Sequence, residues 1–242
     1  MTTGTITPPD ADADAELLTP VERLLRIAMT LAPGQQATIE NVSWEDYEGL
    51  MAAREAAGRY FRLTYDRGSL EIKPTSLAHE LFKKILALLI EAWLSETGGS
   101  YLPGGNVTVQ LRLKKRGFEP DECYYVQNRA RMAGRRQLDP ATDPPPDLVI
   151  EAEVSRAVTA RRLAVFAGLG VPEVWRYDGT RVTVLLLTAA GEYEESVTSR
   201  AVPTFPFPEV PRYVALAESS DDYAVVDRAF RAWVRSRSSG SG

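Results

Sequence analysis

Acidic residues interrupt one of the most apolar stretches of the chain. From Asp147 to Val154 the sequence reads Asp-Leu-Val-Ile-Glu-Ala-Glu-Val, which is typical of a central strand apart from its acids. Side chains alternate between the two faces of a strand, so Glu151 and Glu153 share one face. Two like charges on a buried strand are costly unless a cation or a base compensates them. Glu153 is near the strand end and could simply reach water, whereas the mid-strand position of Glu151 favours a functional role.

Asp121 stands at the start of a second predicted strand, 30 residues before Glu151. It follows Pro120 in the run Phe-Glu-Pro-Asp, and Pro120 fixes how the chain enters the strand. Alone, such an aspartate is explained as a turn or strand cap. Paired with Glu151 on a second strand, it forms an oxygen-rich site suited to Mg²⁺ or Mn²⁺, which prefer hard ligands.

A third acid, Glu80, lies in the first turn of a predicted long helix. There it would complement the helix dipole and could pair with Lys84, or it could reach into the acidic site. Its neighbour His79 is the single histidine, so any Ser-His-Asp catalysis would depend on it. One histidine and one cysteine, Cys123, exclude a multi-histidine or cysteine-rich zinc site.

Hydrophobic periodicity predicts the elements that carry these acids. Apolar residues at helical spacing predict one long helix from Ser76 to Ser95. Alternating apolar and polar residues predict a half-buried strand over Asn106–Leu113, with Leu113 on its apolar side. Further strands are predicted at 59–65, 69–73, 122–127, 147–154, 173–177, 181–187 and 192–197, and further helices from 20, at 44–57, 158–168, 211–217 and 222–235. This order predicts a mixed sheet flanked by helices, with one crossover helix.

Charge is distributed unevenly along the chain. The net charge of −5 argues weakly against nonspecific binding to nucleic acid, which depends on Lys and Arg. Residues 112–136 nevertheless contain eight Lys and Arg residues against three acids. A local basic rim of this kind can act on a ligand even when the total charge is negative. The alternative is a solvated loop and strand edge.

Length and composition indicate one domain in a reducing compartment. A chain of 242 residues, 44% hydrophobic and 25% charged, can form a core without disulfides. The single cysteine and the absence of a secretory leader predict a cytoplasmic protein. No apolar stretch approaches the roughly 20 residues that span a bilayer, so no membrane association is expected. We expect a disordered tail over 1–16, one domain over 17–236 and a flexible end over 237–242.

Several stretches together resemble a known family. They are Ser43-Trp-Glu-Asp-Tyr47, Leu63-Thr-Tyr-Asp-Arg-Gly68, His79-Glu80, Gly117-Phe-Glu-Pro-Asp-Glu-Cys-Tyr-Tyr125, Pro144-Pro-Pro-Asp-Leu-Val-Ile-Glu151 and Gly170-Val-Pro-Glu-Val-Trp-Arg-Tyr-Asp178. The family they resemble is that of the Uma-two endonucleases, also called a domain of unknown function. It belongs to the PD-(D/E)XK restriction-endonuclease-like superfamily, and the resemblance extends from about residue 42 to residue 235.

The resemblance implies an α/β core of the mixed α+β type, with a restriction-endonuclease-like central sheet flanked by helices. It also implies that Glu80, Asp121 and Glu151 hold one or two Mg²⁺ or Mn²⁺ ions that activate water for attack on DNA. The superfamily lysine normally stands two residues after the acid, where this chain has Glu153, a further candidate metal ligand. Relatives supply that lysine from the next helix, at the position of Arg162. An arginine there could stabilise charge but could not readily act as a base.

Two functions are therefore compatible with the sequence. The first is a metal-dependent endonuclease that hydrolyses DNA phosphodiester bonds, as the acidic trio and the resemblance imply. The second is a catalytically impaired nuclease-fold module that binds nucleic acid or a protein partner, as Arg162 and the negative net charge suggest. A homodimer would be consistent with double-strand cleavage, which often uses two symmetric sites.

Overall fold

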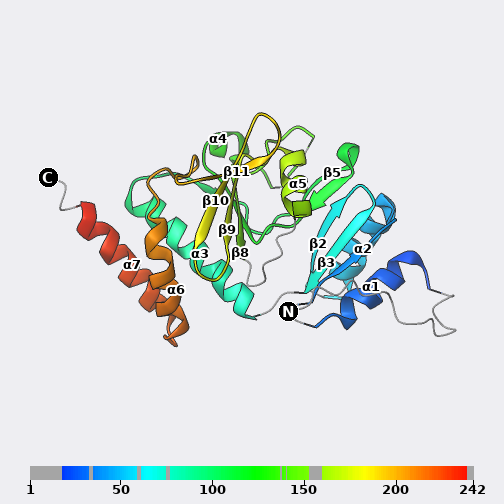
Figure 1. The fold of residues 1–242 in the computed structure, drawn as a ribbon, viewed down its shortest axis with the longest axis horizontal. Coiled ribbons are helices and arrows are strands. Elements are labelled where there is room, and N and C mark those ends of the chain that lie inside the picture. The colour runs from blue at the N-terminus through cyan, green and yellow to red at the C-terminus, as the bar shows by residue number, and fades with distance from the viewer. Residues whose placement is uncertain are drawn as a thin grey trace. The chain divides into compact units, whose positions relative to one another are not determined.

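The computed structural model describes residues 18–32, 35–58, 61–74, 77–136, 138–139, 141–152 and 160–238. The chain divides into two compact units, each made from two segments. The first unit comprises the chain up to Ser76 together with Thr108–Glu119, and the second comprises Leu77–Val107 together with the chain from Pro120 onward. Figure 1 allows each unit to be followed by residue colour. The expectation of one domain over 17–236 stays a prediction.

The two ends of the chain are only partly described. The tail expected over 1–16 lies outside the described residues. At the other end, helix α7 (Tyr223–Ser238) includes the first two of the six residues expected in the flexible end. Within the ranges given above, no helix is both long enough and apolar enough to cross a lipid bilayer.

Both helices of the first unit begin where capping signatures predict them. In front of α1 (Pro20–Thr30), the hydroxyl of Thr19 accepts the backbone N–H of Glu22, and the Glu22 carboxylate accepts the backbone N–H of Thr19. This reciprocal capping box satisfies donors that the helix itself cannot. Helix α2 (Trp44–Ala56) begins after Ser43, whose side chain also caps it.

The first unit also contains an antiparallel sheet with the strand order β1-β3-β2-β6-β5. Its strands are β1 (Ala37–Ile39), β2 (Phe61–Asp66), β3 (Ser69–Pro74), β5 (Val109–Leu111) and β6 (Arg116–Phe118). Leu63 and Ile72, on one face of this sheet, share a buried core with Tyr47 and Leu50 of α2. The apolar face of the sheet thus packs against α1 and α2.

A partly buried ion pair joins α2 to Glu119, the residue after β6. The guanidinium of Arg54 donates from both terminal nitrogens to the carboxylate of Glu119, at 2.6 and 2.5 Å. The same carboxylate accepts the backbone N–H of Leu63 at 3.2 Å and the hydroxyl of Thr108 at 3.1 Å. Glu119 therefore has hydrogen-bond donors on both oxygens, as a buried carboxylate requires.

The strand predicted over 106–113 is too long at both ends, because β5 covers only Val109–Leu111. β5 ends at Leu111, which pairs with Arg116 of β6, and a short 3₁₀ helix (Arg112–Lys114) connects the two strands. Lys115 closes the turn in the left-handed region, at φ 47°. Leu113 is 92% exposed instead of facing a core, because the alternating pattern continues across a turn that reverses the chain.

The second unit contains the mixed sheet that the sequence predicts, in the order β11-β10-β9-β8-β7-β4. Its strands are β4 (Leu102–Pro103), β7 (Glu122–Tyr125), β8 (Leu148–Ala152), β9 (Glu173–Tyr177), β10 (Val182–Leu187) and β11 (Tyr193–Ser196). β8 and β9 are parallel, while their other neighbours run antiparallel. The parallel pair is connected through α5 (Ala160–Leu169), the predicted crossover helix.

Long helices cover this mixed sheet. They are α3 (Leu77–Glu96), α6 (Val210–Glu218) and α7, with shorter elements at α4 (Arg129–Met132) and a 3₁₀ turn at Phe207–Glu209. Leu89 of α3, Ile150 of β8, Trp175 of β9 and Phe230 of α7 belong to one buried core. Glu151 of β8 thus belongs to a sheet whose other face packs against a large apolar core.

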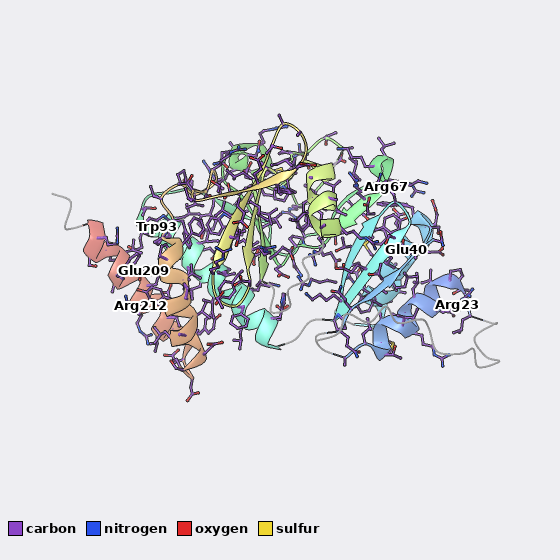
Figure 2. The ribbon with its side chains drawn as sticks, viewed as in Figure 1. Arg23, Glu40, Arg67, Trp93, Glu209 and Arg212 are labelled. Carbon is purple, nitrogen blue, oxygen red and sulfur yellow. The ribbon has the colours of Figure 1, made fainter. Side chains whose placement is uncertain are left out.

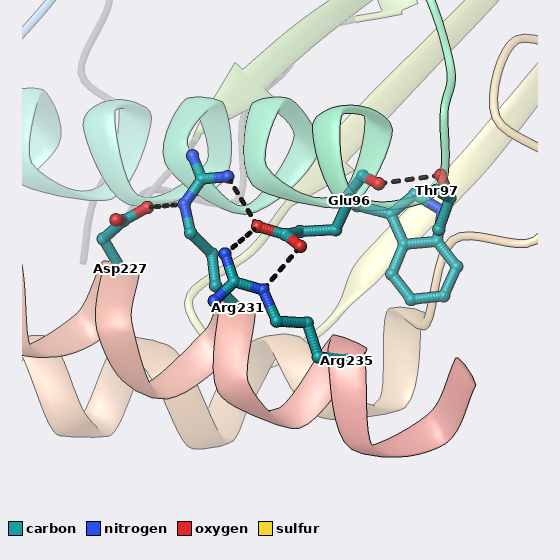
Figure 3. A network of polar contacts seen from close by, with 6 residues as sticks. Glu96, Thr97, Asp227, Arg231 and Arg235 are labelled. Carbon is teal, nitrogen blue, oxygen red and sulfur yellow. Dashed lines mark hydrogen bonds and ion pairs between the residues drawn. The ribbon is translucent and has the colours of Figure 1, made fainter. Parts of the chain in front are cut away.

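An ion-pair network fixes α7 against the end of α3 (Figure 3). Glu96 accepts from Arg235 at 2.7 and 2.8 Å and from Arg231 at 3.2 Å, and Arg231 also donates to Asp227 at 2.8 Å. The Arg235 and Arg231 guanidinium groups lower the pKa of Glu96 to about 2, although burial opposes them. The network therefore contributes to helix packing as long as Glu96 is ionised.

Candidate functional site

The strand register brings two of the predicted acids together. β7 and β8 are antiparallel, with Glu122 opposite Ile150 and Cys123 opposite Val149. Continuing this register by one residue puts Asp121 opposite Glu151 at the same end of the sheet. Because side chains alternate along a strand, both carboxylates lie on one face, while Glu122 points to the other.

Asp121 is almost completely buried and has partners on both oxygens. It is 1% exposed. The backbone N–H of Ala152 donates to Oδ2 at 2.7 Å, and Nε2 of His79 lies 2.8 Å from Oδ1. The Ala152 contact occupies the end of the β7–β8 ladder, where the next backbone partner of β8 would otherwise be. Strand pairing and a side chain from α3 thus fix this carboxylate together.

Glu151 is paired with the candidate arginine. NH2 of Arg162 donates to Oε1 at 2.9 Å, and both residues are 2% exposed. Arg162 comes from α5, and its guanidinium also lies 5.7 Å from the ring centroid of Phe166. A buried carboxylate and a buried guanidinium compensate each other's charge in a setting where either alone would be costly.

The structure puts Glu80 in a different environment. Its side chain is 39% exposed and forms an ion pair with Lys83 at 3.2 Å, rather than with the predicted Lys84. Within the described part of the chain, Glu80 makes no contact with Asp121 or Glu151. Glu153 lies outside the described residues.

His79 is a site residue that the sequence did not assign. It precedes Glu80 on α3 and is 6% exposed. Its contact with Asp121 spans 42 residues of sequence, so no local pattern could predict it. The one available signal was a single histidine within an apolar helical segment, next to the acid that the resemblance selected.

One family model matches the chain, over residues 44–217, and its description is Uma2, putative restriction endonuclease. The match covers more than half of the sequence. The chain belongs to the Uma2 family. No curated protein matches it closely enough to add a function by name. Membership agrees with the restriction-endonuclease-like, mixed α+β fold, and it supports a nuclease-like function.

The acids of this Uma2 protein fit a hard divalent cation. Asp121 and Glu151 together carry two negative charges on oxygen donors, and Mg²⁺ is usually held by one or two carboxylates with water completing its shell. Over the described ranges there is no group of three or more His, Cys, Asp or Glu side chains arranged as a metal site. The fit therefore rests on two carboxylates, with His79 and Arg162 adjacent.

A separate surface pocket lies on another part of the Uma2 fold. It has a volume of about 550 Å³, and neither Asp121 nor Glu151 lines it. Its walls come from α3, α7 and β7, with Glu122 among the lining residues. Burial raises the pKa of Glu122 above its ordinary value, although Lys83 and Lys84 oppose this. Asp121 and Glu122 are thus consecutive carboxylates with different neighbours, and Glu122 is a matched control for Asp121.

Proposed function

We propose that this Uma2-family chain is an endonuclease that hydrolyses DNA phosphodiester bonds with Mg²⁺ or Mn²⁺. The observation that supports it best is the pairing of Asp121 and Glu151 across adjacent strands, each buried and each next to a basic side chain. Two buried carboxylates of this kind are expensive for stability alone. Their cost is explained if they serve a cation and a phosphate.

Each residue of the site would have a distinct task. A bound divalent ion would stabilise charge on the phosphate and lower the pKa of an attacking water. Asp121 and Glu151 would hold it through their carboxylate oxygens, and the Ala152 N–H and His79 keep Asp121 in one orientation. Arg162 stays protonated, so it would act through its charge on the phosphate and not as a base.

Two of the predicted ligands have a secondary place in this proposal. Glu80 would reach the ion only by leaving Lys83, whose side chain is 11% exposed, so binding of the ion would have to offset the loss of that partner. Glu153, two residues beyond Glu151 in the sequence, stays a candidate for a third carboxylate ligand.

The test is cleavage of supercoiled plasmid by the purified chain with Mn²⁺ or Mg²⁺. We expect nicking that Asp121→Asn and Glu151→Gln slow on the order of 10²-fold or more and that Glu122→Gln preserves. Titration calorimetry with Mn²⁺ alone should show binding that the first two variants lose. Cleavage that persists in Asp121→Asn at the wild-type rate would show that the activity comes from another site or another protein.

The second candidate is a nuclease-fold module that binds nucleic acid or a protein without cutting. Arg162 in the position of the family lysine favours it. Absence of both Mn²⁺ binding and cleavage in the wild-type chain would support this alternative.

A further inference from the structure

The turn between β5 and β6, residues Arg112–Lys115, combines positive charge with an exposed apolar side chain. We call it the β5–β6 tip. All four residues are exposed, and Leu113 is 92% exposed. An isolated exposed leucine is ordinary on a protein surface. This one is unusual because cationic side chains stand directly on both sides of it in the sequence.

The tip is held in a fixed conformation by contacts that do not use Leu113. The backbone N–H of Lys115 donates to the carbonyl of Arg112 at 3.0 Å, and the N–H of Arg67 donates to the carbonyl of Lys115 at 2.8 Å. Arg67 is in the β2–β3 turn (Figure 2), so two turns of the same sheet support each other. The left-handed backbone conformation of Lys115 is unfavourable for a residue with a side chain, so the surrounding contacts must fix the shape of the turn.

Acidic side chains near the tip pair with two arginines, one within the tip and one directly after it. Arg112 donates to Glu45 and Glu48 of α2 at 2.7 and 2.8 Å, and Asp66 accepts from Arg116 at 2.9 Å. The side chain of Arg112 is 63% exposed in these pairs. Exposed ion pairs are weak in water, so a phosphate can replace either glutamate at little cost. Lys114 and Lys115 add two further charges next to Leu113.

A second exposed apolar side chain provides the contrast. Val197 is 93% exposed, but it follows Glu194 and Glu195 of β11. Equal exposure thus occurs in an acidic setting in one unit and in a basic setting in the other. A phosphate backbone would be repelled by the first and attracted by the second.

We propose that the β5–β6 tip is a DNA-contacting element in which Leu113 inserts as an apolar wedge between base pairs in the minor groove. Lys114, Lys115 and Arg112 would bind the flanking phosphates and carry the turn to the groove. Apolar side chains on cationic, preformed segments are used in this way to unstack and bend DNA. The proposal rests on DNA being the substrate proposed above, and it assigns DNA deformation to a part of the chain that has no metal ligand.

The experiment separates binding from cutting by using Asp121→Asn as the background, in EDTA. Binding to a short duplex with 2-aminopurine at its centre is followed by anisotropy and by 2-aminopurine fluorescence, which rises when the base unstacks. Leu113→Ala should weaken binding roughly fivefold to tenfold, as partial burial of one leucine side chain implies. It should also remove the fluorescence rise and leave the salt dependence unchanged. The matched control Val197→Ala should change neither signal.

Lys114→Gln and Lys115→Gln should have the complementary effect. Each is expected to lower the slope of log affinity against log salt by about 1. Unchanged affinity, fluorescence and salt slope in all three tip variants would overturn the proposal, whether or not the wild-type chain cuts plasmid. If the tip variants lose these signals and the wild-type chain does not cut plasmid, the proposed role of Leu113 is supported and the proposed nuclease activity is overturned. A wild-type chain that binds no duplex overturns the wedge.

Discussion

Two arginine–glutamate pairs, one in each unit, both have a buried carboxylate, but different groups surround it. Glu119 accepts from Arg54 on both oxygens, from a backbone N–H and from a hydroxyl, all within the first unit. Glu151 receives Arg162 on one oxygen and lies opposite a second buried carboxylate, Asp121. The first arrangement collects donors around one charge, as a structural pair must. The second brings like charges together, which is a cost to stability that a cation can remove.

The largest expected effect is a difference in cleavage rate between variants of Glu151 and of Glu119. Glu151→Gln should lower the cleavage rate on the order of 10²–10³-fold, the cost of removing one preorganised electrostatic group. Glu119→Gln should leave cleavage per folded molecule within a few-fold of wild type and lower the unfolding midpoint instead. Plasmid cleavage and urea unfolding on the same preparations measure the two effects. Equal loss of activity in both variants would remove the distinction between the pairs.

Arg54, like Glu119, is expected to contribute to stability and not to cleavage. Arg54→Ala leaves Glu119 buried without its bidentate partner, and we expect a loss of about 3–5 kcal/mol in the free energy of unfolding. Replacing Arg54 and Glu119 together with Met should recover only part of that loss, because no charge is left uncompensated but the Leu63 N–H and the Thr108 hydroxyl lose their acceptor. Urea denaturation of the single and double variants measures this. A double variant as unstable as Arg54→Ala would contradict the account.

Replacing each of the two arginines with lysine is expected to change the cleavage rate or the stability by a smaller amount. Arg162→Lys retains a positive charge beside Glu151 and restores a group that can lose a proton, so we expect cleavage to rise several-fold. Arg54→Lys gives up the forked contact with Glu119 and should only lower stability. Initial cleavage rates with Mn²⁺, normalised to folded protein, measure the difference. A fall in rate for Arg162→Lys would show that the guanidinium geometry is itself required.

The smallest effect concerns the α3–α7 network. Arg235 and Arg231 lower the pKa of Glu96 to about 2, so its ionised form is favoured by folding. Its contribution is therefore complete above the ordinary pKa of 4.5 and is lost as the pH falls through the folded value. Glu96→Gln should lower the melting temperature modestly at neutral pH, with a difference that shrinks below pH 4.5. Glu195→Gln is the control, and a difference that grew in acid would contradict this.

The sequence predicted the parts of the fold that depend on local signals. The Thr19 and Ser43 caps gave two helix starts to the residue, and β9 lies where the apolar run from Glu173 to Tyr177 predicted it. Alternation along the strands was also enough to bring Asp121 and Glu151 together. These features follow from side-chain chemistry and period over a few residues.

Other features required information that local sequence does not contain. β1 (Ala37–Ile39), β4 (Leu102–Pro103) and β6 are too short to show a period, so they were not predicted. On α3, neighbouring residues differ by about 100° around the axis, and that rotation decides that His79 and not Glu80 contacts Asp121. The rotation is set by packing across the whole helix, which no motif records.

The division of the chain into interleaved segments has a consequence for biosynthesis. The first unit lacks β5 and β6 until Glu119 has been made, although Leu77–Val107 of the second unit has already been synthesised by then. A nascent chain therefore completes the first unit only two residues before Asp121 emerges. The 20-residue, largely apolar helix α3 leaves the ribosome before the strands of its sheet have been synthesised. Its apolar face therefore stays exposed during that part of translation. We therefore expect this order of synthesis to increase the need for chaperones during translation more than it affects refolding of the complete chain from denaturant.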